Sequence, residues 1–286
     1  ALAKKFNGEV ISGDSMQIYK QMDIGTAKVT EEEKEGIIHH CVDILNPDET
    51  YSVHDFQQTV RKKITEITQR GHVPIIVGGT GLYIKAALYD YQFDEMENNH
   101  HAINEKYKDY TNEQLHDHLK SIDEESAKTL HFNNRRRVLR AIEIYETTGK
   151  RKSEMLEEQE HICLYDAYFV GLTLPRDVLY ERINKRVDVM MENGLKEEMD
   201  CLYSQGLTRN HQSMKAIGYK EWFDYYDHQI DLNDVLELIK KHSRQYAKRQ
   251  YTWFKNQFDV HWYDVNLENF EQTIEQVTDD IEKILK

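Results

Sequence analysis

A short, continuously apolar run at Val73–Val77 constrains the fold more than any other stretch of the sequence. Strands of this kind are typical of a parallel sheet that is buried on both faces. Parallel strands need long crossover connections, which are usually helices. The segment before the run fits that need, because Ser52 can cap a helix whose apolar residues recur at helical spacing as far as Gly71. The pattern therefore predicts an α/β fold.

Two predicted strands lead directly into turns that could carry chemistry. Asp14 and Ser15 follow a short apolar strand at 9–11, and the turn Gly78–Gly81 follows the strand just described. Ligands bind at the carboxyl ends of strands in open α/β sheets, so Asp14 and Thr80 are predicted to lie at one edge of the sheet. Asp and Ser after a strand more often cap a helix or make a turn, so position alone does not establish a site.

Composition sets broad limits. The chain has 286 residues, 39% of them hydrophobic, which suffices for one large domain or for a core with a smaller inserted one. No apolar run approaches the length of a membrane span. Cys41, Cys163 and Cys201 are too scattered for a disulfide framework or a metal knuckle, and without a signal peptide this favours the cytoplasm. The pair His39 and His40 has no carboxylate or cysteine at ligand spacing, so packing is favoured over metal binding.

The net charge of −14 argues at first against a nucleic-acid partner. Charge is segregated, however, because no acidic residue lies between Glu237 and Asp259. The basic residues of that stretch are Lys240, Lys241, Arg244, Lys248, Arg249 and Lys255. Their interleaving with aromatic residues fits contact with an RNA backbone and bases, although such aromatics can equally be core and a charge run is more often a solvated face.

The order of segments predicts an inserted domain. Residues 94–161 are polar and helical, whereas 1–93 and 162–286 carry the predicted strands. Whether residues are missing near 98–100 is left open by the sequence. Further predicted elements are a polar helix at 31–38, a strand or connector at 39–45, strands at 168–174 and 261–265, a helix between Gly194 and Gly206, a long helix at about 234–256 and a final acidic helix.

Several segments resemble the tRNA dimethylallyltransferases, the family that prenylates an adenine beside the anticodon. The resemblance starts with D-S-x-Q-x-Y at 14–19 and M-D-I-G-T-A-K at 22–28. It continues in the family's order through 78–83, 133–143, 182–188, 216–221 and 244–255, which together span nearly the whole chain. One departure is Phe132, where the family usually has proline, and this puts the local turn in doubt.

The resemblance implies a core like that of the P-loop nucleotide-binding proteins, with a mainly parallel sheet flanked by helices and a helical insertion. In that family a phosphate-binding loop, G-x-T-x-x-G-K-T, precedes the first helix, and no such motif occurs in this sequence. The first residues, 1–6, read as the last turns of a helix that Asn7 and Gly8 close. We therefore expect that residues are missing before Ala1.

The resemblance also implies roles for individual residues. Asp14 would accept a proton or hydrogen bond from the adenine amino group and Thr80 would lie against the RNA. Asp14, Thr80 and Arg186 are expected to be catalytic. Arg186 would hold the diphosphate with support from Arg182 four residues earlier, although such arginines can also pair with a nearby acid such as Asp188. The residues expected to contact tRNA are Asp14, Ser15, Met16, Gln17, Thr80, Arg136, Arg137, Val138, Leu139, Arg140, Lys215, Ala216, Ile217, Gly218, Tyr219, Lys220, Arg244, Lys248 and Arg249.

The function implied is transfer of a dimethylallyl group from dimethylallyl diphosphate to N6 of adenine 37 in tRNA. We expect the partner to be an anticodon stem-loop, the cofactor to be Mg²⁺ that arrives with the diphosphate, and the enzyme to be a monomer. Two other classes stay open. A P-loop kinase or an AMP-directed isopentenyltransferase would share the core but would not need a basic surface, and a non-catalytic RNA-binding module would not need Asp14 and Arg186.

Overall fold

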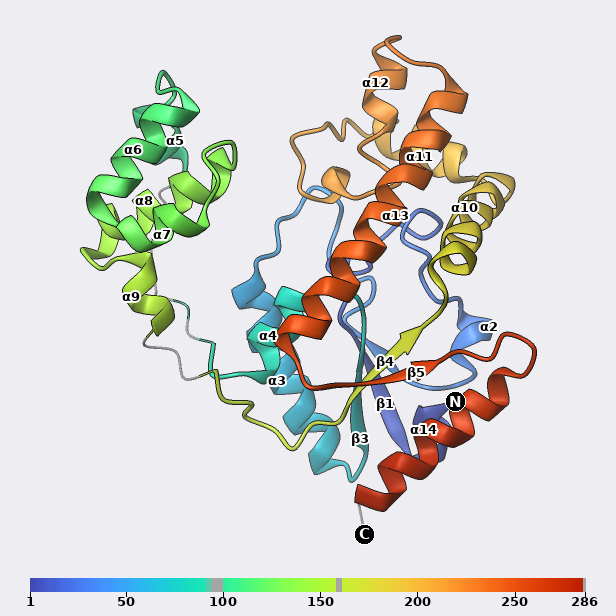
Figure 1. Cartoon of the computed structure of the whole chain (residues 1–286). Coiled ribbons are helices and arrows are strands. Elements are labelled where there is room, and N and C mark those ends of the chain that lie inside the picture. The colour runs from blue at the N-terminus through green and yellow to red at the C-terminus, as the bar shows by residue number, and fades with distance from the viewer. Residues whose placement is uncertain (92, 94–99, 158–160, 285–286) are drawn as a thin grey trace. The chain divides into compact units, whose positions relative to one another are not determined.

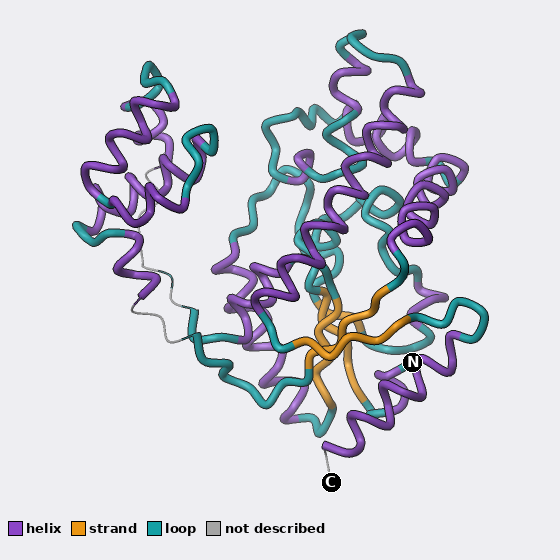
Figure 2. Tube along the Cα trace, in the orientation of Figure 1, coloured by secondary structure: helices purple, strands orange, loops and turns teal. Residues whose placement is uncertain are grey.

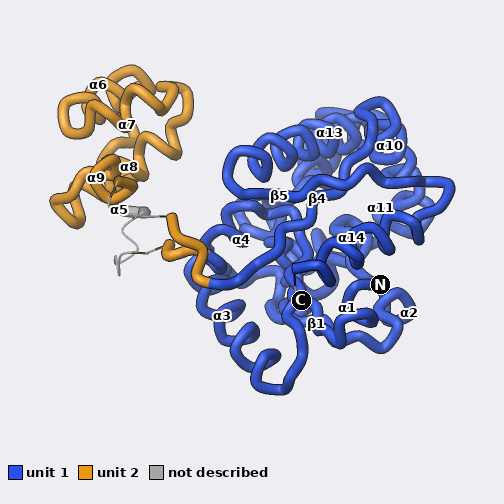
Figure 3. The backbone as a smooth tube through the Cα atoms, turned by 60° about the horizontal axis from the view of Figure 1, so that its bottom comes forward, with its two compact units in different colours: residues 1–88, 165–286 blue, residues 89–164 orange. Residues whose placement is uncertain are grey.

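The computed structural model describes residues 1–91, 93, 100–157 and 161–284. Contacts divide the chain into two compact units, 1–88 with 165–286 and 89–164 (Figure 3). The predicted domain limits, 93/94 and 161/162, lie next to segments outside the described residues, so those limits stay a prediction. The question of missing residues near 98–100 also falls largely outside the described part.

Unit 1 contains two small parallel sheets (Figure 2). In the first, β1 lies between β2 and β3, and both pairings are parallel. In the second, β4 pairs in parallel with β5. The strand bounds are β1 Gly8–Ser12, β2 His39–His40, β3 Val73–Val77, β4 Phe169–Thr173 and β5 Val260–Asp264. The parallel α/β class is confirmed, but the single sheet that the sequence predicts is divided into two in the described residues.

The strand at Val73–Val77 is less buried than its composition predicts. It forms an edge of its three-stranded sheet, because β1 is the neighbour on one side and no other described strand pairs with it. Val73 and Val77 are 44% and 56% exposed, whereas Ile11 of the central strand β1 is fully buried. Burial on both faces therefore holds for the centre of the sheet and is wrong at the ends of β3.

Helices surround these strands in unit 1. Helix α3 packs on β1 and β3, α1 packs on β1, and α14 packs on β5. The long helix α13 runs beside both α4 and α10 (Figure 1). The helix bounds are α1 Leu2–Lys5, α2 Glu31–Lys34, α3 Val53–Gln69, α4 Gly81–Leu88, α10 Arg176–Glu192, α11 Leu195–Ser204, α12 Trp222–Tyr226, α13 Leu232–Gln257 and α14 Phe270–Ile284, with a short 3₁₀ turn at Ser213–Lys215.

The capping signals account for where the helices begin and end. Ser52 caps α3 as predicted, and Asp55 completes a reciprocal capping box with it. Helix α2 is shorter than the predicted 31–38, because Glu35 adopts a left-handed conformation with φ 49° and ends it. The extended segment that follows is also short, and Cys41 with φ 61° ends β2 after two residues.

Unit 2 is helical. Its helices are α5 His100–Lys106, α6 Asn112–Ile122, α7 Glu124–Thr129, α8 Arg135–Thr148 and α9 Lys152–Glu157. An apolar stripe on α8 forms part of the core of this unit, where Val138 and Ile142 pack with Leu115 and Leu119 of α6. Throughout the described chain, no helix combines the length and the apolar character that crossing a membrane requires.

Candidate active site

The two turns predicted to carry chemistry meet at the carboxyl ends of β1 and β3. The backbone N–H of Gly13 donates to the carbonyl of Val77 at 2.7 Å, which continues the ladder between the two strands into the turns. One residue beyond Asp14, the backbone N–H of Ser15 donates to Thr80 Oγ1 at 3.2 Å, and the Thr80 hydroxyl donates to Ser15 Oγ at 3.3 Å. The prediction that Asp14 and Thr80 share one edge of the sheet is confirmed.

Glycine is required where these turns cross. A Cβ on Gly78 would lie 2.3 Å from the backbone carbon of Gly13, so the two main chains are in direct contact there. A Cβ on Gly79 would lie 1.8 Å from the Gln250 side chain, and one on Gly81 would lie 2.0 Å from the Trp253 ring. The glycine-rich turn thus packs between the turn at Gly13 and helix α13.

Asp14 is a half-buried carboxylate with little compensation for its charge. Burial raises its pKa above the ordinary 3.8, and hydrogen bonds from the backbone of Met16 and Gln17 oppose that shift. The Met16 N–H donates to Asp14 Oδ1 at 2.8 Å. Among the described residues, no lysine, arginine or histidine forms an ion pair with Asp14. A carboxylate in this state can accept a proton more readily than an ordinary surface aspartate.

One face of α13 holds the glycine-rich turn. The Tyr246 hydroxyl and the Gln250 amide both donate to the carbonyl of Gly79, at 3.3 Å and 3.1 Å. Near the end of the same face, Lys85 of α4 donates to Gln257 at 2.6 Å. Neither Tyr246 nor Gln250 is among the site residues that the sequence predicts. The spacing 246, 250, 253 and 257 was the available signal, because it marks one helical face that mixes aromatic and amide side chains.

A carboxylate on helix α11 holds the loop that follows Asp14. The Glu198 carboxylate of α11 accepts hydrogen bonds from three consecutive backbone N–H groups, Asp23 and Ile24 at 2.8 Å and Gly25 at 3.1 Å. It also accepts the Tyr219 hydroxyl at 2.6 Å. No sequence signal pointed to Glu198, since a glutamate on an amphipathic helix is ordinarily solvated. Through Glu198 the contacts join two of the motif segments, 22–28 and 216–221.

The segment 215–220 packs against Glu198 and the loop that it holds. Tyr219 is fully buried and Ala216 is 7% exposed, so both side chains lie inside the protein. A Cβ on Gly25 would lie 2.5 Å from the Tyr219 ring, and Gly218 adopts a left-handed φ of 96° beside the Gly25 carbonyl. Lys215 and Lys220 are exposed, whereas Ile217 is half-buried. The structure therefore places the apolar members of this segment behind the Asp14 loop, and the lysines at the surface.

Polar side chains also tie the Asp14 loop to itself. The Gln17 amide accepts from Ser12 Oγ at 3.0 Å and donates to the carbonyl of Thr26 at 3.2 Å. Lys28 Nζ donates to the Tyr19 carbonyl at 2.8 Å and to Asp43 at 2.6 Å, and also pairs with Asp23. Gln17 is thus engaged within the loop, and Ser15 and Met16 beside it are half-buried.

Arg182 and Arg186 lie four residues apart on α10 and both are exposed. In the described part of the chain neither forms an ion pair, and the predicted alternative partner Asp188 pairs instead with Lys240 at 2.7 Å. The same helix contacts α13, where Asn184 accepts a hydrogen bond from Arg244. Among the contacts of the described residues, none joins either guanidinium to Asp14. Both remain accessible to an anion.

The outward cations of α13 are Lys248 and Arg249, which are exposed and have no acidic partner among the described residues. Arg249 lies over the Tyr246 ring, 5.7 Å from its centroid. The basic run is not uniform, because Arg244 is half-buried against Asn184 and therefore has a structural contact. Two of the three predicted RNA-contacting cations of this helix are thus free at its surface.

In unit 2, helix α8 carries the predicted arginine cluster. Arg136 and Arg137 are exposed, Arg140 pairs with Glu143 at 2.9 Å, and Val138 and Leu139 are buried in the core of the unit. Burial and the neighbouring charge of Arg137 lower the pKa of Lys152 on α9, which places that lysine beside the cluster. Burial of Val138 and Leu139 fixes which face of α8 points inward, and Arg136 and Arg137 lie on its accessible surface.

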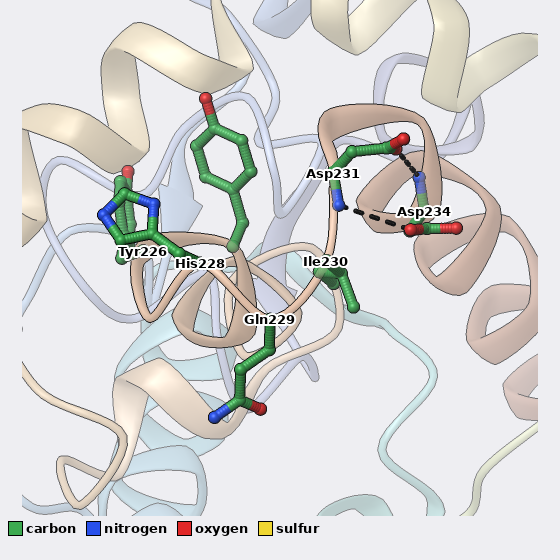
Figure 4. A pocket seen from close by; sticks show the side chains of 7 residues that line it. Tyr226, His228, Gln229, Ile230, Asp231 and Asp234 are labelled. Carbon is green, nitrogen blue, oxygen red and sulfur yellow. Dashed lines mark hydrogen bonds between the residues drawn. The ribbon is translucent and has the colours of Figure 1, made fainter.

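A hollow of about 560 Å³ lies away from these contacts, at the turn between α12 and α13 (Figure 4). Its lining residues are Tyr225, Tyr226, His228, Gln229, Ile230, Asp231 and Asp234. Figure 4 shows Asp231 and Asp234 joined by two hydrogen bonds, which form the capping box of α13. These carboxylates are committed to the helix cap, and no predicted site residue lines the hollow.

The histidines and cysteines that the structure describes have local contacts of their own. Within the described ranges, no three His, Cys, Asp or Glu side chains come together as a metal site would require. The paired histidines follow the packing interpretation, since His39 Nδ1 contacts the Ile37 carbonyl at 2.9 Å and His40 Nε2 contacts Glu9 at 2.6 Å. Cys41, Cys163 and Cys201 are thiols and form no disulfide, and burial raises the pKa of Cys41 to about 11, which makes this thiol unreactive.

With this geometry in place, comparison with known proteins assigns the family. The sequence model of the IPP transferase family matches residues 17–257. The chain belongs to the IPP transferase family. A tRNA dimethylallyltransferase of Bacillus cereus is 53% identical over 272 residues, which are 92% of this chain and 84% of that protein. The resemblance inferred from the motifs is confirmed.

Solved structures agree with this assignment. A tRNA isopentenylpyrophosphate transferase of Staphylococcus epidermidis is 49% identical, with a TM-score of 0.71 over 99% of this chain and 93% of that chain. A eukaryotic dimethylallyltransferase, described as acting on tRNA, is 32% identical with a TM-score of 0.84 over 97% of this chain and 72% of that chain. Other members of this family therefore share both the sequence pattern and the fold.

Proposed function

We propose that this member of the family transfers a dimethylallyl group from dimethylallyl diphosphate to N6 of adenine 37 in tRNA and releases diphosphate. The observation that carries the proposal is the placement of Asp14. Its carboxylate is half-buried, unpaired among the described residues, and fixed beside Thr80 at the sheet edge where α/β proteins bind ligands. The P-loop-like core and the inserted helical domain at 94–161 belong to the same proposal.

The chemistry is a displacement at an allylic carbon. The N6 lone pair of adenine forms a bond to C1 of the dimethylallyl group while the bond from C1 to the diphosphate oxygen breaks, and that electron pair leaves with the diphosphate. Asp14 takes the proton that N6 loses, as a general base. A pKa raised by burial suits this role, because the carboxylate then holds the proton more firmly than an ordinary aspartate would.

Arg186 neutralises charge on the leaving diphosphate in this proposal, with Arg182 in support. A guanidinium can bind two phosphate oxygens at once, which favours arginine over lysine for the role. The exposure of both side chains and their lack of a described acidic partner support it. We place Mg²⁺ on the diphosphate itself, because the described residues offer no carboxylate cluster that could hold the ion without it.

Exposed cations of α13 and of α8 contact the tRNA in this proposal. Lys248 and Arg249 of α13 supply contacts from unit 1, and Arg136 and Arg137 of α8 supply contacts from unit 2. Phosphate contacts of this kind fix the position of the RNA, and the target adenine leaves its stack to reach Asp14. A monomeric enzyme in the cytoplasm is the simplest setting for this reaction.

A parallel labelling reaction tests the acceptor. Full-length protein is given labelled dimethylallyl diphosphate and Mg²⁺ with either unmodified tRNA or AMP. We expect label on tRNA alone, and loss of that label when adenine 37 is replaced by guanine. Comparable label on AMP would favour a small-nucleotide isopentenyltransferase. Binding of tRNA without any transfer would favour a non-catalytic RNA-binding protein.

A further inference from the structure

We propose that Tyr246 is a positioning residue for the transfer reaction, which holds the Gly79–Thr80 turn in place beside Asp14. The inference rests on the proposed function, because it concerns the same site. The motif that contains Tyr246 indicates only a basic helix, and the inference gives this side chain a role of its own. That role is performed by the inward face of α13, not by the face that carries Lys248 and Arg249.

The contacts form a short chain that ends at the catalytic turn. The Tyr246 hydroxyl donates to the Gly79 carbonyl at 3.3 Å, and it also interacts with the Thr80 side chain. Thr80 in turn accepts the Ser15 N–H and donates to Ser15 Oγ. Ser15 is the residue that follows Asp14, so displacement of Thr80 would change the direction of the Asp14 carboxylate.

The arrangement leaves the turn little freedom. Tyr246 and Gln250 lie four residues apart on α13 and both donate to one carbonyl, so they fix the plane of the peptide between Gly79 and Thr80. Gly79 has no room for a side chain, because Gln250 occupies the space. The turn is therefore held from the helix side by two hydrogen bonds and by close packing.

The electrostatics place Tyr246 near the reacting carboxylate. Burial raises the pKa of Tyr246 and the negative charge of Asp14 raises it further, whereas hydrogen bonds with Thr80 and Gln250 lower it. The hydroxyl therefore stays protonated at neutral pH and keeps the proton that it donates to the Gly79 carbonyl. Arg249 lies over the ring of Tyr246, so a residue that is proposed to bind RNA is adjacent to the residue that holds the turn.

Tyr246→Phe tests the proposal, since it removes the hydroxyl and keeps the packed ring. We expect the single-turnover rate of transfer to tRNA to fall about tenfold, while the tRNA and diphosphate affinities and the unfolding temperature stay as in the wild type. Tyr251→Phe is the matched control. Tyr251 lies on the same helix, is 46% exposed, and packs its ring near Trp262, so its variant should keep the wild-type rate.

A double-mutant cycle shows whether Tyr246 acts through Thr80. If it does, Tyr246→Phe should have little further effect on the rate in a Thr80→Val background, because the chain of contacts is already broken. A Tyr246→Phe rate within about twofold of the wild type, or fully additive effects in the cycle, would overturn the inference. Wild-type protein that transfers nothing to tRNA would instead overturn the proposed function and this inference with it.

Discussion

Two carboxylates at opposite ends of strand β1 have opposite surroundings. Glu9 lies in the first half of β1 and is 2% exposed, and its oxygens meet Arg70 at 2.7 Å, His40 at 2.6 Å and His72 at 2.7 Å. Hydrogen bonds from Arg70 outweigh the opposing effect of burial and, with those from the two histidines, lower the pKa of Glu9 to about 2.

Asp14 lies just beyond the other end of the same strand and has no such partners among the described residues. Burial therefore raises its pKa. The comparison teaches that burial alone does not decide what a carboxylate does here. Cationic partners keep Glu9 ionised and make it part of the framework, and their absence from the described surroundings of Asp14 leaves that residue able to accept a proton.

The largest expected effect comes from replacing Asp14, the carboxylate that takes part in the reaction. Asp14→Asn should lower the single-turnover rate by a factor of roughly 10² to 10⁴, the usual contribution of a positioned acid or base. The amide keeps the size and one acceptor oxygen, so folding and RNA affinity should stay as in the wild type. Rapid-quench assays with saturating tRNA measure the rate, and near wild-type turnover would remove Asp14 from the mechanism.

Arg186→Ala tests whether the positive charge of the site binds the diphosphate. We expect affinity for dimethylallyl diphosphate to fall about 10- to 100-fold, because the variant cannot make charge-assisted hydrogen bonds to the phosphate, while tRNA affinity hardly changes. Titration of each substrate separately measures both quantities. Arg176→Ala, on the same helix with its guanidinium over the Tyr180 ring, is the control and should keep diphosphate affinity. The reverse pattern for Arg186 would contradict its assignment.

Glu9→Gln tests the other carboxylate, which is expected to stabilise the fold and to have no part in the reaction. We expect a decrease of about 2 kcal/mol in the free energy of unfolding, because Arg70 and the histidines lose their charged acceptor. The transfer rate should stay as in the wild type when measured well below the unfolding temperature. Urea denaturation of both proteins checks the stability. A stable Glu9→Gln protein with a slow reaction would mean that the two carboxylates do not divide their tasks in this way.

The same residue sets the sign of a pH effect. The folded pKa of Glu9 is lowered from the usual 4.5 to about 2, so the stability that it contributes is complete above about 4.5 and is lost as the pH falls toward 2. Glu9→Gln should therefore differ from the wild type most at neutral pH and least near pH 2. A constant difference in unfolding free energy across that window would contradict the linkage.

The smallest effect concerns charges remote from either carboxylate. If Lys248 and Arg249 each contact a phosphate, replacing either one by alanine should reduce the slope of log affinity against log salt for tRNA by about one. Lys240→Ala is a suitable control because Lys240 is already paired with Asp188 and Glu237. Filter binding across a range of salt concentrations gives the slope. An unchanged slope in Lys248→Ala and Arg249→Ala would place the RNA on another surface.

Sequence patterns predicted the parts of the site that local chemistry determines. The strand ends at Ser12 and Val77, the glycine-rich turn and the position of Asp14 follow from apolar runs and turn residues, and the structure brings them together as expected. The contacts of Glu198 could not be predicted, because its carboxylate meets backbone N–H groups from residues some 175 positions away. Long-range pairings of that kind leave no periodic trace in the sequence.

The same limit explains the misjudged surfaces. Val77 looked buried because its neighbours are apolar, yet exposure at a sheet edge depends on which strand lies alongside. Likewise, the motif that contains Tyr219 gave no hint that this side chain packs beneath the Asp14 loop. The inward face of α13 and the turn that it contacts became evident only from the hydrogen bonds to Gly79.

The pH dependence of the single-turnover rate tests the central claim, that Asp14 is the unpaired carboxylate that accepts the proton. With wild-type protein and saturating substrates, we expect the rate to fall at acid pH with an apparent pKa above 3.8, while the protein is still folded. Asp14→Asn should react slowly and lack this acid limb. An identical acid limb in Asp14→Asn, or a wild-type rate that stays constant until the protein unfolds, would contradict the account.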